Sequence, residues 1–270
     1  NGIANKVLPN EDLKWEQSKT FDVGVDVGLF DQRVDVIFDY FNRRTDDLIT
    51  QLPMPLSSGF DVITTNYGSL NNRGIEVEVK VQVMPKRSEL QWELGFNASH
   101  VKTKIRKLPE NGVERNRVGG YYAWNPEIND YDWVGGLQEG GRIGDLFAWK
   151  SLGIYATDEE AKADPVVDMM DPYEDKTKYG GDTRWYDADG NGQIDEKDIC
   201  YMGNTYPKWT GGISSSWSWK NFDLYLRMDY MTGHTIFNEQ KIFLCGRWAG
   251  NLNIPQEMID KSWKKQGDIA

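Results

Sequence analysis

The residue types best suited to chemistry lie in one short acidic segment, residues 187–198, which reads DADGNGQIDEKD. Asp187, Asp189 and Asn191 alternate along this segment, and a glycine follows at the sixth position, as in a calcium-binding loop. Ca²⁺ takes roughly six to eight oxygen ligands, and a loop can wrap one ion only if alternate side chains turn inward. Gln193 would act through its backbone carbonyl and Asp195 directly or through water. The spacing therefore predicts a calcium ligand set of Asp187, Asp189, Asn191, Gln193, Asp195 and Asp198.

The surroundings of this acidic loop differ from those of a calcium sensor. Asp198 stands at the twelfth position, where the usual loop carries Glu, and no amphipathic helix flanks the loop on both sides. Ile194 takes the eighth position, which is the expected place for an apolar anchor. We therefore expect a structural ion that stiffens an exposed loop, rather than an ion that opens a groove. The alternative is an ordinary turn rich in Asp, Asn and Gly.

No other segment of the sequence resembles an active site. The two histidines, His100 and His234, lie far apart, and the serines at 57–58 and 214–216 lack the setting of a nucleophile elbow. Acidic pairs such as Glu159-Glu160 could act as glycosidase carboxylates, but most such pairs are solvated charge. We therefore expect a protein without enzymatic activity.

The charge of the chain argues against a nucleic acid partner. Its 31 Lys and Arg residues and 42 Asp and Glu residues give a net charge of −11, whereas phosphate binding needs clustered basic residues. The 2 cysteines are too few for a disulfide framework or a cysteine-based zinc site. No apolar run approaches the length of about 18 residues that a membrane-spanning helix requires.

In the segments that must position the acidic loop, apolar and polar residues alternate with a period of two. In residues 20–30, the apolar side chains from Phe21 to Leu29 share one face, while Asp22 and Asp26 share the other. Alternation of this kind predicts β-strands with one apolar and one polar face. The same pattern recurs in residues 33–44, 74–83, 90–99, 209–219 and 222–230.

These strands are expected to pair as long hairpins, at about 20–44, 74–99 and 209–230. Each strand has around ten residues, which is the length of a tilted membrane-crossing strand, whereas strands of soluble proteins have about five to six. Short turns such as Asp31-Gln32 contrast with long loops at about 45–73 and 104–206, an asymmetry typical of outer-membrane barrels. We therefore predict an all-β fold, a segment of a large antiparallel transmembrane β-barrel with long extracellular loops.

Aromatic residues fit this prediction but also fit other folds, because aromatic side chains are favoured in strands generally. Those that fall at or near strand ends, where barrels carry aromatic girdles, are Trp15, Phe41, Trp92, Trp209, Trp217, Trp219 and Tyr230. The aromatic segment 121–133 could stack on sugar rings or pack one loop against another, and both alternatives stay open. A soluble, calcium-stabilised, carbohydrate-binding β-domain is the alternative to the barrel.

The sequence resembles the C-terminal barrel region of the SusC/RagA class of TonB-dependent outer-membrane transporters from Bacteroidetes-type bacteria. The similarity runs in collinear order from about Leu13 to Asn238. The segments that carry it are LKWE at 13–16, YFNRRTDDL at 40–48, NYGSLNNRGIE at 66–76, GDLFAW at 144–149 and the acidic region 181–198.

The resemblance implies a barrel of about 22 strands with an N-terminal plug, in the cell outer membrane of a Gram-negative bacterium. It also implies uptake of glycan oligomers or, in some members, peptides, energised through TonB and assisted by a SusD-like surface lipoprotein. Residues 1–270 show no plug, TonB box or signal sequence, and the chain lacks an initiator Met. We therefore expect a partial barrel domain from a longer protein, with TonB contacted through regions missing here.

Overall fold

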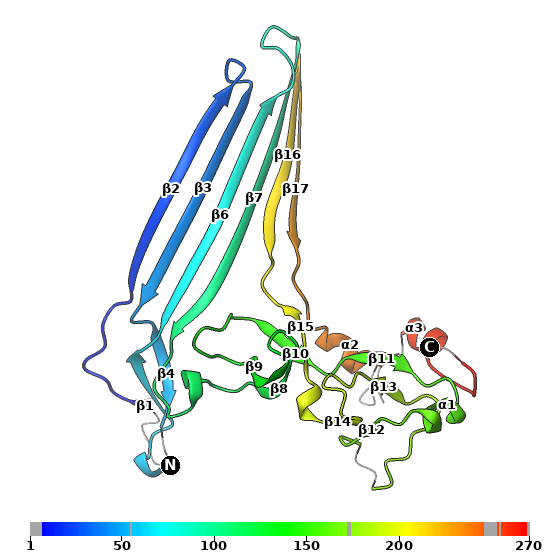
Figure 1. The fold of residues 1–270 in the computed structure, drawn as a ribbon. Helices are drawn as coiled ribbons and strands as arrows, with labels where there is room; N and C mark the ends of the chain where they lie inside the picture. The colour runs from blue at the N-terminus through cyan, green and yellow to red at the C-terminus, as the bar shows by residue number, and fades with distance from the viewer. Residues whose placement is uncertain (1–6, 55, 172–173, 246–252, 254, 269–270) are drawn as a thin grey trace. The chain divides into compact units, whose positions relative to one another are not determined.

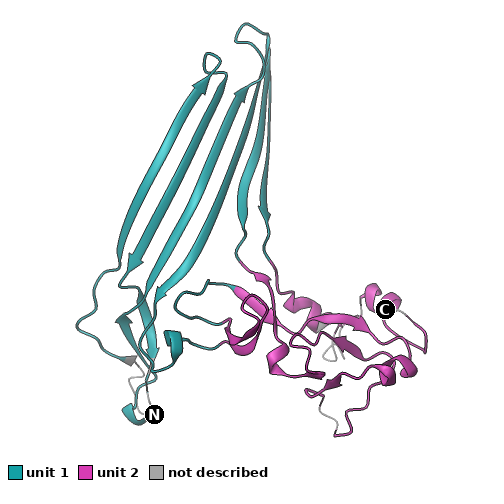
Figure 2. Cartoon of the chain, viewed as in Figure 1, with its two compact units in different colours: residues 1–119, 136–144, 206–234 teal, residues 120–135, 145–205, 235–270 magenta. Residues whose placement is uncertain are grey.

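The computed structural model describes residues 7–54, 56–171, 174–245, 253 and 255–268. The chain divides into two compact units (Figure 2). Unit 1 comprises residues 1–119, 136–144 and 206–234, and unit 2 comprises residues 120–135, 145–205 and 235–270. Among the described residues, no helix is both long enough and apolar enough to span a membrane.

Unit 1 is built on one layer of six long strands in the order β17-β16-β7-β6-β3-β2 (Figure 1). Every neighbouring pair in this sheet is antiparallel. The strand bounds are β2 Gln17–Leu29, β3 Val34–Asp46, β6 Ser69–Gln82, β7 Leu90–Lys107, β16 Trp209–Trp219 and β17 Phe222–Thr232. They lie where sequence periodicity predicted the three hairpins, and most extend further than expected. β7 alone is 18 residues long.

The remaining elements of unit 1 lie within segments that we expected to be loops. A small sheet has the strand order β1-β5-β4. Its strands β4 and β5 lie within the predicted 45–73 loop, so part of that loop is strand. The bounds are β1 Val7–Leu8, β4 Ile49–Pro53, η1 Leu56–Ser58, β5 Val62–Asn66 and η2 Glu114–Asn116.

Unit 2 consists of short paired strands and short helices. Its sheets are the pairs β8-β9, β10-β15, β11-β13 and β12-β14. The strands are β8 Tyr121–Asn125, β9 Asp130–Val134, β10 Asp145–Ala148, β11 Ser151–Ile154, β12 Val167–Asp168, β13 Thr183–Trp185, β14 Gln193–Ile194 and β15 Cys200–Asn204. The helices are α1 Asp158–Ala163, η3 Glu196–Asp198, α2 Glu239–Cys245 and α3 Gln256–Lys261.

The register of the six-stranded sheet separates apolar from charged side chains. Directly opposed residues share a face, and one row across all six strands runs Val25, Phe38, Val77, Ala98, Gly211 and Tyr230. The next row, on the opposite face, includes Asp26, Glu78 and Asp229. The predicted alternation therefore becomes a continuous apolar face and a continuous polar face.

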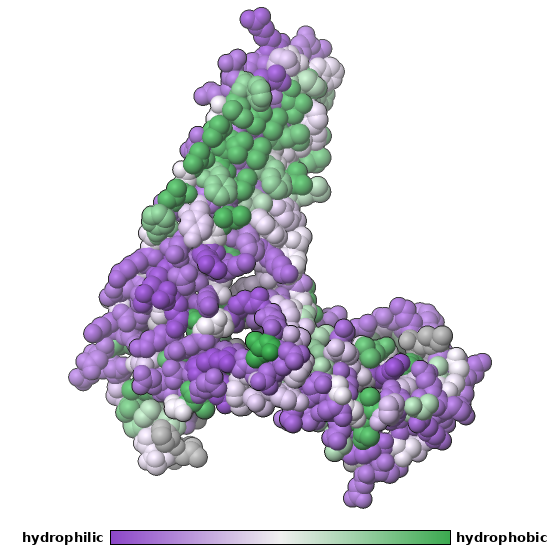
Figure 3. All heavy atoms as spheres, viewed as in Figure 1, coloured by the Kyte–Doolittle hydropathy of each residue, from purple (hydrophilic) through white to green (hydrophobic). Residues whose placement is uncertain are grey.

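We call the exposed apolar surface of this sheet the apolar belt (Figure 3). Many of its side chains are solvent-exposed, from Val23 at 50% on β2 to Met228 at 66% on β17. It consists of Val23, Val25, Val27, Leu29, Val34, Val36, Phe38, Tyr40, Ile75, Val77, Val79, Val81, Trp92, Leu94, Phe96, Ile213, Trp217, Leu224, Leu226, Met228 and Tyr230. In monomeric soluble proteins, contiguous apolar patches of this extent are rare, so the belt indicates contact with an apolar environment.

Two expectations about the long strands differ from the structure. The turn after β2 is longer than Asp31-Gln32, because Phe30, Asp31 and Gln32 all have positive φ and the ladder resumes only at Val34. Phe41, expected in an aromatic girdle, lies on the polar face, where it opposes Asp22 and Gly74. Position within a strand suggested the girdle, but the odd–even register decides the face.

The contact between Phe41 and Gly74 makes a prediction about sheet stability. A Cβ at Gly74 would lie 2.7 Å from the His100 carbonyl oxygen and 2.7 Å from the Phe41 ring. We expect Gly74→Ala to lower the free energy of unfolding by about 1–3 kcal/mol because of this overpacking. Urea unfolding of the full-length protein in detergent measures it. Gly28→Ala is the control, since its Cβ would meet Asp35 Oδ1 at 3.4 Å and Gln32 Cγ at 3.6 Å, both ordinary contacts. An equal loss in both variants would contradict the explanation.

Candidate metal centre

The acidic loop 187–198 is held on both sides by short strands of unit 2. β13 precedes it, and β14 within it pairs with β12 in parallel, with Val167 N donating to Gly192 O at 3.0 Å. β15 follows directly and pairs with β10. Ile194 is only 3% exposed, which agrees with its expected role as the apolar anchor. The loop is therefore held in place by backbone hydrogen bonds between short strands and by the buried side chain of Ile194.

Three of the predicted ligands converge. Oxygen atoms of Asp187, Asp189 and Asp198 all lie within 4.8 Å of one another. Two oxygens bound to one Ca²⁺ at about 2.3–2.6 Å are at most roughly 5 Å apart, so the three carboxylates have the spacing of a shared ion. Asp198 is fully buried, whereas Asp187 and Asp189 are half-buried. The donor set is all oxygen and acidic, which suits a hard cation such as Ca²⁺.

Backbone N–H groups orient the carboxylates. Asp187 accepts hydrogen bonds from Gly190 N and Gly192 N, both at 2.8 Å. These two glycines have φ of +74° and +81°, a region that side chains disfavour, so the turn around Asp187 requires glycine. Asp198 accepts from Ala188 N at 2.8 Å and Asp195 N at 2.7 Å.

The electrostatics of the cluster favour a bound cation. Burial is the largest cause that raises the pKa of Asp198, and the charges of Asp189 and Asp187 raise it further, against the two backbone hydrogen bonds. Like charges held this close repel one another unless a cation or a proton lies between them. A divalent ion would offset both the repulsion and the burial of the Asp198 charge.

The other three predicted ligands have different neighbours. Asn191 Oδ1 accepts from Gln193 N at 2.7 Å, and its Nδ2 donates to Asp189 at 3.0 Å. The Asp195 carboxylate caps η3 by accepting from Lys197 N at 2.7 Å. Asp195 lies outside the group of three carboxylates. Ligation by Asn191, by the Gln193 carbonyl and by Asp195, directly or through water, therefore stays a prediction.

Tyr131 is a neighbour of the site that spacing along the sequence could not reveal. Its hydroxyl donates to Asp189 Oδ2 at 2.6 Å across a separation of 58 residues. That hydrogen bond is the largest cause that raises the pKa of Tyr131 to about 12. Trp149 Nε1 also donates to the Asp195 carbonyl at 2.8 Å. Two aromatic donors thus contact a loop for which the sequence suggested only acidic and small residues.

The aromatic segment 121–133 forms the β8–β9 hairpin, and its register puts Tyr122, Trp124, Tyr131 and Trp133 on one face. Neighbouring ring centroids on this face lie 5.4 to 5.9 Å apart. Since the rings contact one another and Tyr131 binds the acidic loop, the packing alternative accounts for most of this face. Tyr122 remains 48% exposed.

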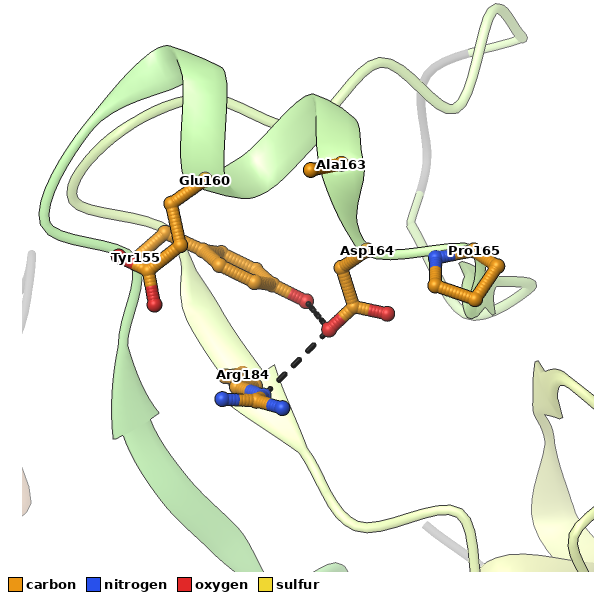
Figure 4. A pocket seen from close by; sticks show the side chains of 6 residues that line it. All are labelled: Tyr155, Glu160, Ala163, Asp164, Pro165 and Arg184. Atoms are coloured by element: carbon orange, nitrogen blue, oxygen red, sulfur yellow. Dashed lines mark hydrogen bonds and ion pairs between the residues drawn. The ribbon is translucent and has the colours of Figure 1, made fainter.

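A second polar cluster lines a cavity of about 290 Å³ beside α1 (Figure 4). Asp164 accepts from the Tyr155 hydroxyl at 2.9 Å and forms ion pairs with Arg184 at 3.4 Å and Lys178 at 3.7 Å. Burial raises the pKa of Asp164, but the hydrogen bonds from Val166 N and Tyr155 and the two cations lower it overall. The carboxylate therefore joins α1 to β13 as a structural node.

An open sheet of long antiparallel strands, apolar on one face and acidic on the other, is the wall of a membrane β-barrel. The chain belongs to the TonB dependent receptor-like β-barrel family, whose model matches residues 1–241. The resemblance to SusC/RagA-type transporters is therefore confirmed, as is the assignment to a segment of a large antiparallel barrel. This family consists of receptors and transporters rather than enzymes.

Relatives with known names agree with this membership. TonB-dependent receptor P3 of Formosa agariphila is 31% identical over 96% of this chain, and TonB-dependent receptor SusC of Bacteroides thetaiotaomicron is 26% identical over 96%. The solved structure of the RagAB peptide transporter superposes with a TM-score of 0.65 at 22% identity, over 96% of this chain and 26% of that chain. The chain spans about a quarter of the length of these curated relatives, 24% in both cases.

The convergence of the three carboxylates predicts stabilisation by calcium. In the full-length protein, a hundredfold excess of Ca²⁺ over its dissociation constant should stabilise the native state by about 2.7 kcal/mol. We expect the Tm to rise with Ca²⁺ after chelator treatment and to stay constant in the Asp187→Ala/Asp189→Ala variant. Glu196→Gln is the control, because this exposed residue lies in the same loop but outside the cluster. A Ca²⁺ response in the double variant, or none in the wild type, would exclude this ion site.

The Asp164 node predicts a pH-dependent contribution to the stability of unit 2. Because its folded pKa lies below the ordinary value of 3.8, its contribution is present above that pH and is lost as the pH falls through the lowered folded pKa. Asp164→Asn should cost about 1–3 kcal/mol at neutral pH, since Arg184 and Lys178 lose their shared carboxylate.

Hydrogen exchange of β11 and β13 at pH 7 and below pH 4 measures the effect of Asp164→Asn. The variant should exchange faster at pH 7 and lose less protection on acidification than the wild type. Glu159→Gln is the matched control, since that exposed carboxylate has no ion pair among the described residues. If hydrogen-exchange protection depended on pH equally in the wild type and in Asp164→Asn, Asp164 would not be the group that stabilises β11 and β13.

Proposed function

We propose that the chain forms part of the wall and external loops of a TonB-dependent outer-membrane importer of nutrient oligomers. The observation that carries this proposal is the amphipathic sheet. From Phe222 to Tyr230 the apolar face of β17 rises about 27 Å along the strand, at about 3.4 Å per residue. With a barrel tilt of roughly 35–45°, this gives a height near 21 Å, close to the apolar band of about 25 Å in outer-membrane barrels.

The polar face would line the interior of the closed barrel. Its carboxylates outnumber its cations Arg43, Lys80 and Arg227, and they are Asp22, Asp26, Asp35, Asp39, Glu76, Glu78, Glu93, Asp223 and Asp229. Such side chains tolerate water or a protein plug but not lipid. A soluble, calcium-stabilised, carbohydrate-binding β-domain is disfavoured, because it would leave the apolar belt in water.

The partners follow from the family. A SusD-like surface lipoprotein would cover the extracellular side, and TonB would energise uptake through regions outside this chain. The substrates are glycans or peptides, since the family includes SusC and a structurally similar protein is described as a peptide transporter. Relatives from Formosa and Bacteroides favour a Gram-negative, Bacteroidetes-type cell. Calcium in the 187–198 loop would be structural, and we expect no catalysis.

Uptake by intact cells tests this function. Cells that carry the full-length protein should import labelled oligomers from either a glycan or a peptide panel, and deletion of its gene or of TonB should abolish that import. The protein should fractionate with the outer membrane and need detergent for extraction. Extraction by salt alone would exclude the barrel, and uptake that persists without TonB would exclude energised import.

A further inference from the structure

Basic side chains gather on the apolar side of the six-stranded sheet, just beyond one end of the apolar belt. We call this surface the basic band, and it consists of Lys19, Arg44, Arg73, Lys102, Lys104 and Lys107. In Figure 3 a hydrophilic surface directly adjoins the apolar one on this face. This concentration is unexpected in a chain with a net charge of −11.

The register fixes these residues on the belt side. Lys19 opposes Arg44, Arg44 opposes Asn71, and Asn71 opposes Lys104, so these residues share one row and one face. The row nearer the belt contains Arg73 opposite Lys102. The following row contains Tyr40 and Ile75, which already belong to the belt. The basic band is therefore continuous with the belt across β2, β3, β6 and β7.

The charges of the basic band are largely uncompensated. In the described rows that contain the basic band, Asp46 is the one carboxylate, and it forms an ion pair with Arg44 at 2.8 Å. All of the basic residues are solvent-exposed, and no ion pair within the described residues involves Arg73, Lys102 or Lys104. The acidic residues of the strands lie instead on the opposite face. On the belt side, positive charge is thus in excess at this end of the sheet, whereas the polar face carries an excess of carboxylates.

A cavity of about 460 Å³ lies at the far edge of the basic band. Three basic residues, Arg44, Arg106 and Lys107, line it together with two carboxylates, Asp46 and Asp47. The β6–β7 register shifts between Ser69 and Leu70, so Arg106 bulges out of the ladder. The band therefore combines surface charge with a recess that can receive a polar group.

We infer that the basic band binds the phosphate groups of lipid headgroups in the outer leaflet of the membrane; this inference rests on the proposed function. Lys102 and Lys104 lie two and four residues beyond the belt row of His100 and Ile75. At about 3.4 Å per residue and a tilt near 40°, they stand roughly 5 and 10 Å above the hydrocarbon edge, which is the depth of the headgroup layer. Arginine and lysine are the side chains that bind phosphate.

The test compares two matched variants of the full-length protein in detergent. The band variant is Arg73→Gln/Lys102→Gln/Lys104→Gln, and the control is Lys86→Gln/Arg87→Gln/Lys220→Gln, whose residues occupy turns at the other end of the belt. The probes are bisphosphorylated lipid A, the same lipid without phosphates, and inorganic phosphate. Each is titrated while the Tm is measured, and apparent affinities are taken from the shifts.

Each basic residue near an anionic lipid surface contributes about fivefold in affinity, so the band variant should bind phosphorylated lipid A about a hundredfold more weakly at low salt. The control should bind like the wild type, and added salt should weaken both. A charge-conserving variant, Arg73→Lys/Lys102→Arg/Lys104→Arg, should retain binding, which separates loss of charge from loss of folding.

Several outcomes would overturn the inference. These are equal affinity in the band and control variants, equal binding of lipid with and without phosphates, and a Tm shift from inorganic phosphate that matches that from lipid A. The last result would indicate a free-anion site. Failure of the proposed function is distinguishable, because a wild type that is extracted without detergent would refute the barrel whatever the titrations give.

Discussion

The continuous antiparallel ladder from β2 to β17 is the constraint on which the other features depend. Where lipid replaces water, every backbone N–H and C=O group needs a partner within the protein, and strands satisfy this only by pairing with both neighbours. Once the ladder forms, side chains must alternate between two faces. A slip by one residue would bring Asp26 and Glu78 to the belt side, so side-chain pattern and hydrogen-bond register specify each other.

The strands continue beyond the belt, and their chemistry changes within one row. Tyr40 and Ile75 are belt residues, whereas Arg73 and Lys102 in the next row are basic. The backbone of each long strand is therefore the same in the apolar and the polar region, and only the side chains differ. Unit 2 follows a different principle. Few of its described apolar residues are fully buried, and hydrogen-bonded carboxylates such as Asp164 and Asp198 join its short strands.

A buried carboxylate loses hydration, and neighbouring carboxylates repel it. The two clusters of unit 2 differ in how these unfavourable effects are offset. Asp164 is neutralised by nearby cations and a tyrosine hydroxyl, so its pKa falls. Asp198 has two backbone donors but also two carboxylate neighbours, so its pKa rises. The first cluster is electrostatically complete, whereas the second would need a divalent cation to balance its charges. This contrast separates a structural node from a candidate metal centre, although both contain buried aspartate.

The sequence by itself determined the strands, their two faces and the spacing of the acidic loop, because periodicity and turn chemistry act between residues that are close along the chain. It could not bring Tyr131 to Asp189 across 58 residues. The basic band was equally hidden, since its residues come from different strands. Only the tertiary pairing decided these features, because register between distant segments determines which side chains share a row.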